Sequence, residues 1–252
     1  MLRISLLERL KPNQTSAAID AADSSVVAGK LKGSKFLSAA AKEVWVLEIM
    51  RPVEDFFIRA RIHPNTISIL GFFLTLIASV MLATNHLIWG GWLIVLSGCF
   101  DFLDGRVARR MNLTSSAGAF FDSVLDRYMD FAGLIALGIL FRDQPWILCL
   151  VYLAILGSTA TPYIRAKSEV LGIEGTGGEM QRPERVVLIG ATAALSGYFQ
   201  TLTYPFVSIG GELPPYLLII GLALVALNSN KTALQRFLFT FRELKNRDRS
   251  AS

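Results

Sequence analysis

Six apolar segments constrain the fold of this chain more than any other feature of its sequence. They lie near residues 66–84, 87–103, 117–140, 145–163, 186–204 and 213–229. Each approaches the roughly 20 residues that an α-helix needs to cross the hydrocarbon core of a bilayer. Backbone groups in lipid must be hydrogen-bonded within the spanning element, so these segments are expected to be helical. The sequence therefore predicts an all-α integral membrane protein with six transmembrane helices.

The basic residues predict how these helices are oriented. Lys and Arg are concentrated in residues 1–63, in the second-to-third and fourth-to-fifth connections and in the C-terminal tail. The alternate connections contain only Arg142. Basic loops stay on the cytoplasmic side of a membrane. We therefore expect a multi-pass protein of the cell membrane whose termini and two basic loops face the cytoplasm, and we attribute the net charge of +5 to topology rather than to nucleic-acid binding.

The region before the first span divides into two parts. Residues 13–40 lack sustained apolar periodicity and are rich in Ser, Ala, Asp, Lys and Gly, and they follow a short amphipathic stretch. We therefore expect residues 1–40 to be a flexible N-terminal segment. Between residues 42 and 62, apolar and charged residues alternate around Pro52, a pattern typical of a kinked amphipathic helix in the membrane interface. The membrane domain is expected to cover residues 41–245.

Aspartates inside two of the predicted helices are the most unusual feature of the membrane region. They are Asp101, Asp104, Asp122, Asp126 and Asp130. An isolated charge in a membrane helix costs several kcal/mol. Spacings of three and four residues put the first two on one helix face and the other three on another. Four converging carboxylates repel one another unless a cation holds them, and oxygen ligands favour Mg²⁺, Mn²⁺ or Ca²⁺, so the sequence predicts a divalent metal site.

A structural interpretation of the same aspartates has to be weighed against the metal site. They could pair with Arg106, Arg109 and Arg127 or cap helices at the membrane surface. The acids outnumber these basic partners, which favours the metal site.

The spacing of this segment is also specific. It runs Asp101, two residues, Asp104-Gly105, two residues, Ala108-Arg109, eight residues, Gly118, three residues, Asp122, three residues, Asp126. Every fixed position of the CDP-alcohol phosphotransferase signature is present, and the chain resembles that family from about residue 43 to 245. The resemblance implies transfer of a phosphatidyl group from a CDP-linked lipid, such as CDP-diacylglycerol, to an alcohol, with release of CMP. It also implies a role in phospholipid biosynthesis, two Mg²⁺ or Mn²⁺ ions per active site and a homodimer.

The resemblance assigns the acidic residues distinct roles. Asp101, Asp104 and Asp122 would bind metal, and Asp126 would complete a second metal site and act as the general base toward the acceptor hydroxyl. These roles are chemically reasonable, because a carboxylate beside a metal-polarised alcohol can accept its proton as the oxygen attacks phosphorus.

The resemblance also implies a site for the CDP-lipid donor. Its residues would be Pro64, Asn65, Thr66, Ile67, Gly105, Arg109 and Ser115. Gly105 lacks a side chain where the nucleotide comes closest, and Arg109 offers a planar fork for phosphate oxygens. Helix packing through small residues is the alternative for Gly105 and Gly118. An N-cap role is the alternative for Asn65 or Thr66.

A second basic cluster lies in the fourth-to-fifth connection. It contains Arg165, Lys167, Arg182 and Arg185. The donor's pyrophosphate already has metal and Arg109, which leaves this cluster without an obvious anion and suits a phosphorylated acceptor. The stretch partly resembles that of the prokaryotic phosphatidylinositol phosphate synthases, with a basic pair before a Gly-rich turn and an Arg-Pro-Glu-Arg run. Inositol phosphate is therefore the expected acceptor.

Three alternatives to that acceptor assignment remain open. Glycerol 3-phosphate would also suit a basic pocket, which would make the chain a phosphatidylglycerol phosphate synthase. The four basic residues could instead only mark the cytoplasmic side. An ion-coupled transporter would also carry intramembrane acids, but it predicts acids on several helices, whereas here they are concentrated on two.

Overall fold

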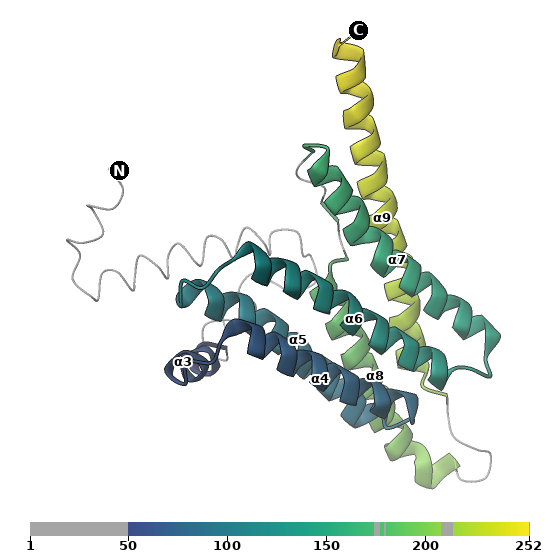
Figure 1. Cartoon of the computed structure of the whole chain (residues 1–252). Helices are drawn as coiled ribbons and strands as arrows, with labels where there is room; N and C mark the ends of the chain where they lie inside the picture. The colour runs from purple at the N-terminus through teal and green to yellow at the C-terminus, as the bar shows by residue number, and fades with distance from the viewer. Residues whose placement is uncertain (1–49, 174–176, 179, 208–213, 252) are drawn as a thin grey trace. The chain divides into compact units, whose positions relative to one another are not determined.

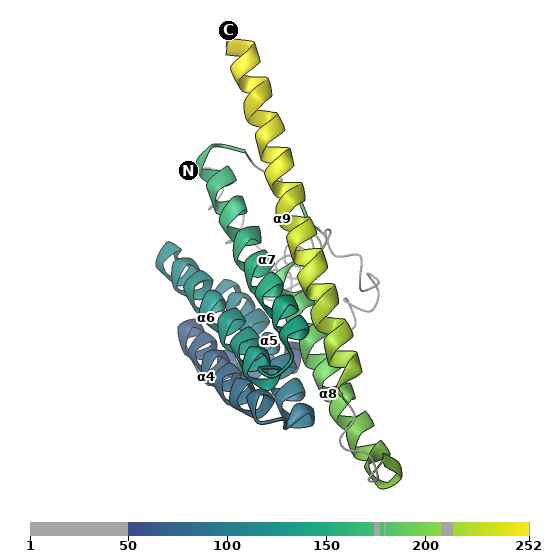
Figure 2. The same cartoon turned by 90° about the vertical axis from the view of Figure 1, so that its right-hand side faces the viewer.

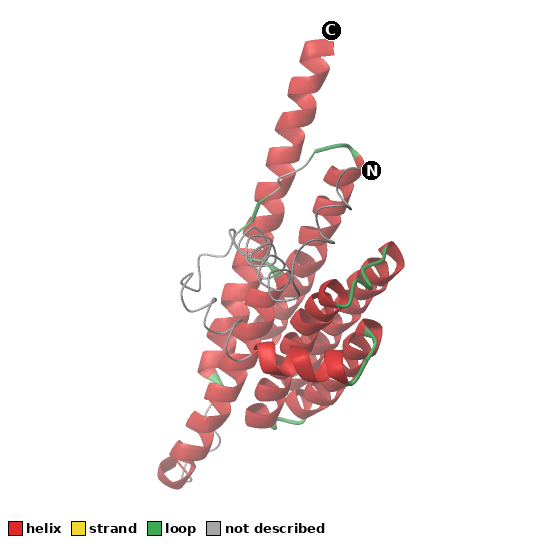
Figure 3. Cartoon of the chain, turned by 90° about the vertical axis from the view of Figure 1, so that its left-hand side faces the viewer, coloured by secondary structure: helices red, strands yellow, loops and turns green. Residues whose placement is uncertain are grey.

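The computed structural model describes residues 50–173, 177–178, 180–207 and 214–251, and within these residues the chain is helical, with no strand (Figure 3). The helices are α3 (Arg51–Arg59), α4 (Pro64–Ala83), α5 (Leu87–Arg110), α6 (Ser116–Leu140), α7 (Pro145–Val170), α8 (Arg182–Val207) and α9 (Tyr216–Ala251). The predicted all-α class is confirmed. The predicted flexible segment, residues 1–40, and the first part of the predicted interfacial helix lie outside the described residues.

Five of these helices, α4, α5, α7, α8 and α9, are long and apolar enough to cross a membrane. Helix α6 coincides with the predicted third span and has 25 residues, which corresponds to about 37 Å at 1.5 Å per residue. It differs from the other five because its charged residues, Asp122, Asp126, Arg127 and Asp130, leave it a shorter stretch free of charge than each of those helices has. Its length suits a span, and its charges show that it carries polar function together with α5.

The helices pack around an apolar core. Helix α4 packs against α5 and α6, α5 packs against α8, and α7 runs alongside α9, which also contacts α8 (Figures 1 and 2). Buried apolar side chains such as Leu82, Leu137 and Leu222 fill the space between them. Large apolar side chains, among them Phe73, Val80 and Leu156, are exposed on the outside. A core and an outer surface that are both apolar are expected of helices surrounded by lipid.

A short turn brings the two acidic helices together. After α5 ends, Asn112 adopts a positive φ of 55°, which reverses the chain direction. Ser115 then caps α6, because its Oγ accepts a hydrogen bond of 3.0 Å from the Gly118 backbone N–H. Asp101 and Asp104, in the second half of α5, are therefore placed beside Asp122 and Asp126, in the first half of α6.

Helix α3 is attached to the same end of α5 by buried ion pairs. Glu54 is fully buried and pairs with Arg106 and Arg110. Arg110 Nη1 also lies 2.8 Å from Asp55 Oδ1. Arg106 is therefore neutralised by α3, which contradicts the interpretation that pairs it with the intramembrane aspartates.

Aromatic side chains gather at the helix ends that lie away from the acids of α5 and α6. Trp89 and Trp92 lie near the start of α5, and Trp146 lies at the start of α7. All three are exposed, and Trp92 Nε1 donates a hydrogen bond of 3.3 Å to the Tyr198 hydroxyl on α8. Trp and Tyr are enriched where a helix leaves the hydrocarbon core. These residues therefore indicate one membrane boundary, far from the acidic ends of α5 and α6.

Helix α9 continues well beyond the predicted sixth span, which ended at residue 229. Its polar extension is fixed to α7. Arg247 Nη1 and Nη2 donate hydrogen bonds of 3.0 Å to the Leu171 carbonyl and 2.7 Å to the Gly172 carbonyl. A cation at these carbonyls stabilises the C-terminal end of α7, where Gly172 has a φ of 69°.

Candidate active site

Three carboxylates meet between α5 and α6 at the predicted metal site. One oxygen from each of Asp101, Asp122 and Asp126 lies within 4.8 Å of the other two. Mg²⁺ binds carboxylate oxygens at about 2.0 to 2.1 Å, so ligands on opposite sides of one ion are about 4 Å apart. The separation and the hard oxygen donors both fit a divalent cation of the Mg²⁺ or Mn²⁺ type. The structure therefore brings together three of the four predicted metal ligands.

The fourth predicted ligand, Asp104, lies outside that group of three. It is buried, and its Oδ2 accepts a hydrogen bond of 2.5 Å from Ser68 Oγ on α4. It remains close enough to Asp101 and Asp122 to interact with them electrostatically. Its role as a metal ligand stays a prediction, and Ser68 is the residue that holds this carboxylate in place. No pattern in the sequence indicates Ser68, because one serine inside an apolar span is common.

Arg182 crosses from α8 to the carboxylate group. Its Nη1 lies 2.5 Å from Asp101 Oδ2 and 3.0 Å from Asp126 Oδ1. Arg185, one turn further along α8, contacts a different acid, with its Nη2 2.6 Å from Asp130 Oδ2. The expectation that these arginines lack an anion is wrong for both, because α5 and α6 supply carboxylates. Any role of Arg182 and Arg185 in binding the acceptor's phosphate has to account for these contacts with carboxylates.

Arg165 and Lys167 occupy a different environment from Arg182 and Arg185. Both are exposed on the last turns of α7, and Arg165 Nε lies 2.8 Å from Glu169 on the same helix. The structure thus separates the predicted acceptor cluster into an exposed pair on α7 and an enclosed pair on α8.

Arg236 on α9 lies near both pairs, although in the sequence it is only one of several basic residues of the C-terminal tail. It is buried and donates hydrogen bonds of 2.9 Å to the Thr161 carbonyl and 3.0 Å to the Gly177 carbonyl. Arg165 and Arg185 both act on it electrostatically, so the three guanidinium groups belong to one positive region. A single arginine in a basic tail carries no spacing signal that could have identified it.

The predicted donor residues lie where α4 and α6 begin. His63 caps α4, because its Nδ1 accepts a hydrogen bond of 3.2 Å from the Asn65 backbone N–H. The N-cap alternative for Asn65 and Thr66 is therefore wrong, and both side chains are at least partly accessible. Pro64 and Ile67 are buried, so they can support the donor site only through packing.

Gly118 lies beside this start of α4. A Cβ at Gly118 would be 3.1 Å from Ser115 Oγ and 3.6 Å from Asn65 Oδ1. The glycine therefore permits the close approach of the α6 cap to α4. Two of the predicted donor residues, Ser115 and Asn65, are therefore close together beside Gly118.

Gly105 has no packing reason to be a glycine. A Cβ built there would meet only Arg109 Nη1, at an ordinary contact distance of 3.5 Å. At Gly157 on α7, in contrast, a Cβ would lie 2.8 Å from the Asn230 backbone nitrogen on α9. Helix packing therefore explains Gly157 but not Gly105, and for Gly105 the approach of the donor beside Arg109 stays the prediction.

Gly105→Ala is accordingly expected to leave the protein folded while it weakens donor binding. Alanine is favoured over glycine in a helix by about 0.5 to 1 kcal/mol, so the thermal midpoint should be unchanged or higher. A methyl group that intrudes on a fitted ligand costs about 1 to 3 kcal/mol, which corresponds to a KM for the CDP-linked lipid raised roughly 5- to 150-fold. Thermal unfolding and donor KM, measured on the same preparation, check both parts.

Gly157→Ala is the matched control for this substitution. It should lower the thermal midpoint, because the new methyl group would displace the backbone of α9. A Gly105→Ala variant with unchanged donor KM would contradict the assignment of Gly105 to the donor site.

Comparison with known sequences agrees with this site. The family model described as CDP-alcohol phosphatidyltransferase matches residues 61–229. The phosphatidylinositol phosphate synthase of Mycobacteroides abscessus is 32% identical over 156 residues, which cover 60% of this chain and 71% of the relative. The archaetidylinositol phosphate synthase of Methanothermobacter thermautotrophicus is 32% identical over 205 residues, which cover 79% of this chain and 96% of the relative.

Solved structures of a related enzyme share the fold. One is the phosphatidylinositol phosphate synthase of Mycobacterium tuberculosis in complex with manganese and citrate, with a TM-score of 0.65 and 27% identity, covering 77% of this chain and 89% of that chain. Another is the same enzyme with CDP-DAG bound, with a TM-score of 0.62 and 25% identity, covering 77% of this chain and 94% of that chain. The family model covers well over half of the sequence and includes every residue of the acidic motif, so this chain belongs to the CDP-alcohol phosphatidyltransferase family of enzymes.

Proposed function

We propose that this enzyme transfers a phosphatidyl group from CDP-diacylglycerol, or a related CDP-linked lipid, to a hydroxyl of inositol phosphate and releases CMP. The observation that carries the proposal is the position of the two α8 arginines beside the carboxylate group. Arg182 contacts two of its acids, and Arg185 lies one turn away with 5% of its surface exposed. A phosphate held by these arginines would bring an attached hydroxyl close to Asp126.

In the proposed reaction each residue acts on a defined atom. Asp126 accepts the proton of the acceptor hydroxyl as its oxygen attacks the lipid-linked phosphorus. Asp101, Asp104 and Asp122, together with Asp126, would hold divalent metal, which supplies electrostatic stabilisation of the charge that develops on the departing CMP. Arg109 would add a bidentate contact to a donor phosphate. We propose that the metal is Mg²⁺ or Mn²⁺, with two ions per active site.

The membrane arrangement is part of the proposal. Helix α6 would be the third of six spans, since its acids face the site and its length suffices to cross. The site would open to the cytoplasm, because the Lys and Arg of the two basic loops lie at the ends of α5 and α7 and at the start of α8. Helix α3 would lie at the same surface. A homodimer in the cell membrane is expected from the family.

Two alternatives are weighed against this function. The family assignment removes the transporter interpretation, because members of this family are transferases. Glycerol 3-phosphate remains the second candidate acceptor, since a basic pocket also suits its phosphate. The two relatives above are named as a phosphatidylinositol phosphate synthase and an archaetidylinositol phosphate synthase, and these names support inositol phosphate over glycerol 3-phosphate as the acceptor.

Arg185→Ala tests the acceptor half of the proposal. A charge-assisted hydrogen bond to phosphate is worth about 1.5 to 3 kcal/mol, so the KM for inositol phosphate should rise roughly tenfold to a hundredfold. The KM for the CDP-linked lipid should barely change, because Arg185 contacts Asp130 rather than the carboxylate group. Initial rates of CMP release at varied acceptor concentration give both constants.

Arg142→Ala is the matched control, since Arg142 is 73% exposed and pairs only with its neighbour Asp143 among the ion pairs of the described residues. Its kinetic constants should equal those of the wild type. An unchanged acceptor KM in Arg185→Ala would withdraw Arg185 from the acceptor site.

A further inference from the structure

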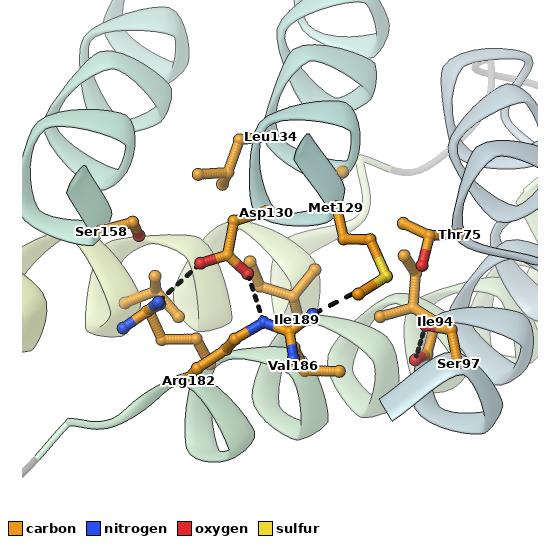
Figure 4. A pocket seen from close by; sticks show the side chains of 13 residues that line it. Thr75, Ile94, Ser97, Met129, Asp130, Leu134, Ser158, Arg182, Val186 and Ile189 are labelled. Carbon is orange, nitrogen blue, oxygen red and sulfur yellow. Dashed lines mark hydrogen bonds and ion pairs between the residues drawn. The ribbon is translucent and has the colours of Figure 1, made fainter. Parts of the chain in front are cut away.

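Arg182 lies between two anionic positions that are four residues apart on α6. Its Nη1 contacts Asp126, together with Asp101 from α5, at 3.0 and 2.5 Å. Its Nε lies 3.3 Å from Asp130 Oδ1. Figure 4 shows the Arg182 side chain turned toward Asp130. The same guanidinium group therefore spans the metal-site carboxylates and a third acid.

Asp130 differs from the three carboxylates that meet. It lies outside their group, its side chain is 10% exposed, and it is the acid that both α8 arginines share. Arg185 Nη2 contacts its second oxygen at 2.6 Å. Each oxygen of Asp130 thus holds one arginine, and this arrangement fixes the side chains at the start of α8.

A small cavity adjoins this junction. Its volume is about 40 Å³, and Asp130, Arg182 and Arg185 line it together with Ser158 and Ser97. The Ser158 hydroxyl is buried and makes no hydrogen bond within the described residues. A cavity needs about 10 to 15 Å³ for each water, so there is room here for a few waters or for a moved guanidinium group. Arg182 therefore has space beside Asp130 into which it can move, in a cavity whose remaining lining is mostly apolar, as at Leu134 and Ile189.

A divalent cation and the Arg182 guanidinium compete for the same oxygens. Asp101 and Asp126 belong to the group that fits a metal, and they are also the two acids that Arg182 Nη1 contacts. A unit positive charge about 3 Å from these oxygens repels a second cation that approaches them. Arg182 must give up these contacts for a cation to be bound by the same carboxylates.

We propose that Arg182 neutralises Asp101 and Asp126 before metal binds and is released by the metal toward Asp130 and the acceptor's phosphate. Asp130 is in this account a positioning residue, which holds Arg182 and Arg185 for the acceptor once the metal is in place. Metal binding then favours acceptor binding, because it frees Arg182 from Asp101 and Asp126. Binding of the acceptor's phosphate to Arg182 likewise frees these two carboxylates for metal, and such coupling is reciprocal. The inference rests on the metal site of the proposed function.

The test is the affinity for Mn²⁺, measured by electron paramagnetic resonance on the full chain without donor or acceptor. Arg182→Gln should tighten Mn²⁺ binding about tenfold, within the usual 5- to 150-fold range for coupled sites. Arg182→Lys keeps the charge and should stay close to the wild type. Arg185→Gln is the matched control, because it removes the same charge from the same helix. Among the acids of the described residues Arg185 pairs only with Asp130, so the effect should be much smaller.

A double-mutant cycle tests Asp130. Asp130→Asn should weaken Mn²⁺ binding, because Arg182 loses its alternative partner and stays with Asp101 and Asp126. If Asp130 acts through Arg182, this effect should disappear when Asp130→Asn is made in the Arg182→Gln variant. An equal effect in both backgrounds would show that Asp130 acts only through its own charge and would overturn its positioning role.

The outcomes separate this inference from the proposed function. Mn²⁺ binding by the wild type that is lost in Asp122→Asn supports the metal site. With that result in hand, an unchanged or weaker Mn²⁺ affinity in Arg182→Gln overturns the inference alone. Absence of Mn²⁺ binding by the wild type overturns the metal site and the inference together.

Discussion

Asp126→Asn is expected to lower the rate of CMP release by about 10² or more, with donor affinity close to that of the wild type. The asparagine keeps the volume and hydrogen-bonding capacity of the side chain but cannot accept the proton of the acceptor hydroxyl. Asp126 is one of the three acids that meet between α5 and α6, so its oxygen is close to the metal that would polarise that hydroxyl. Turnover and binding of the CDP-linked lipid are measured separately.

The matched control for this substitution is Asp143→Asn. Asp143 follows α6 at its other end and is 86% exposed, so the same chemical change there should leave turnover unaffected. Near-normal turnover in Asp126→Asn would refute the general-base assignment and leave Asp126 as a structural acid that pairs with Arg182.

Removal of divalent metal is expected to reduce CMP release to background, with full recovery when Mg²⁺ or Mn²⁺ is restored. Three carboxylates with oxygens within 4.8 Å of one another repel a pyrophosphate, and the single positive charge of Arg182 does not offset all three, so divalent metal is needed. Initial rates before chelation, after exhaustive chelation and after addition of each metal give the result.

The fold should survive this treatment. Arg182 can neutralise Asp101 and Asp126 in the absence of metal, so circular dichroism should report the same helix content before and after chelation. Loss of activity with unchanged helix content would show that the metal is needed for the reaction and not for the fold. CMP release at the full rate after exhaustive chelation would contradict a metal-dependent mechanism.

The positions of the helices followed from hydropathy, but their ends did not. All six predicted spans fall on α4 to α9. Helix α7 continues to Val170, past the predicted end at residue 163, and α8 begins at Arg182, before the predicted start at residue 186. Apolar composition reports only the part of a helix that faces lipid, whereas backbone hydrogen bonding continues into polar sequence. The extra first turn of α8 is what carries Arg182 and Arg185 to the acids.

The acidic site was predictable because its residues lie on two helices joined by a short turn. Spacing along each helix and one reversal at Asn112 suffice to bring the carboxylates together. The contacts of Ser68, Asp130 and Arg236 join helices that are far apart in the sequence. A single serine, aspartate or arginine has no periodicity that indicates its partner, so these contacts required the structure.

A direct comparison of acceptors tests whether a phosphorylated polyol receives the phosphatidyl group. The purified enzyme is incubated with CDP-diacylglycerol and Mg²⁺ or Mn²⁺, and CMP release is measured with inositol phosphate, glycerol 3-phosphate, inositol or serine as the acceptor. We expect the fastest CMP release with inositol phosphate and little release with unphosphorylated inositol. Faster release with glycerol 3-phosphate would assign the enzyme to phosphatidylglycerol phosphate synthesis, and equal use of inositol and its phosphate would contradict recognition of the acceptor's phosphate by the α8 arginines.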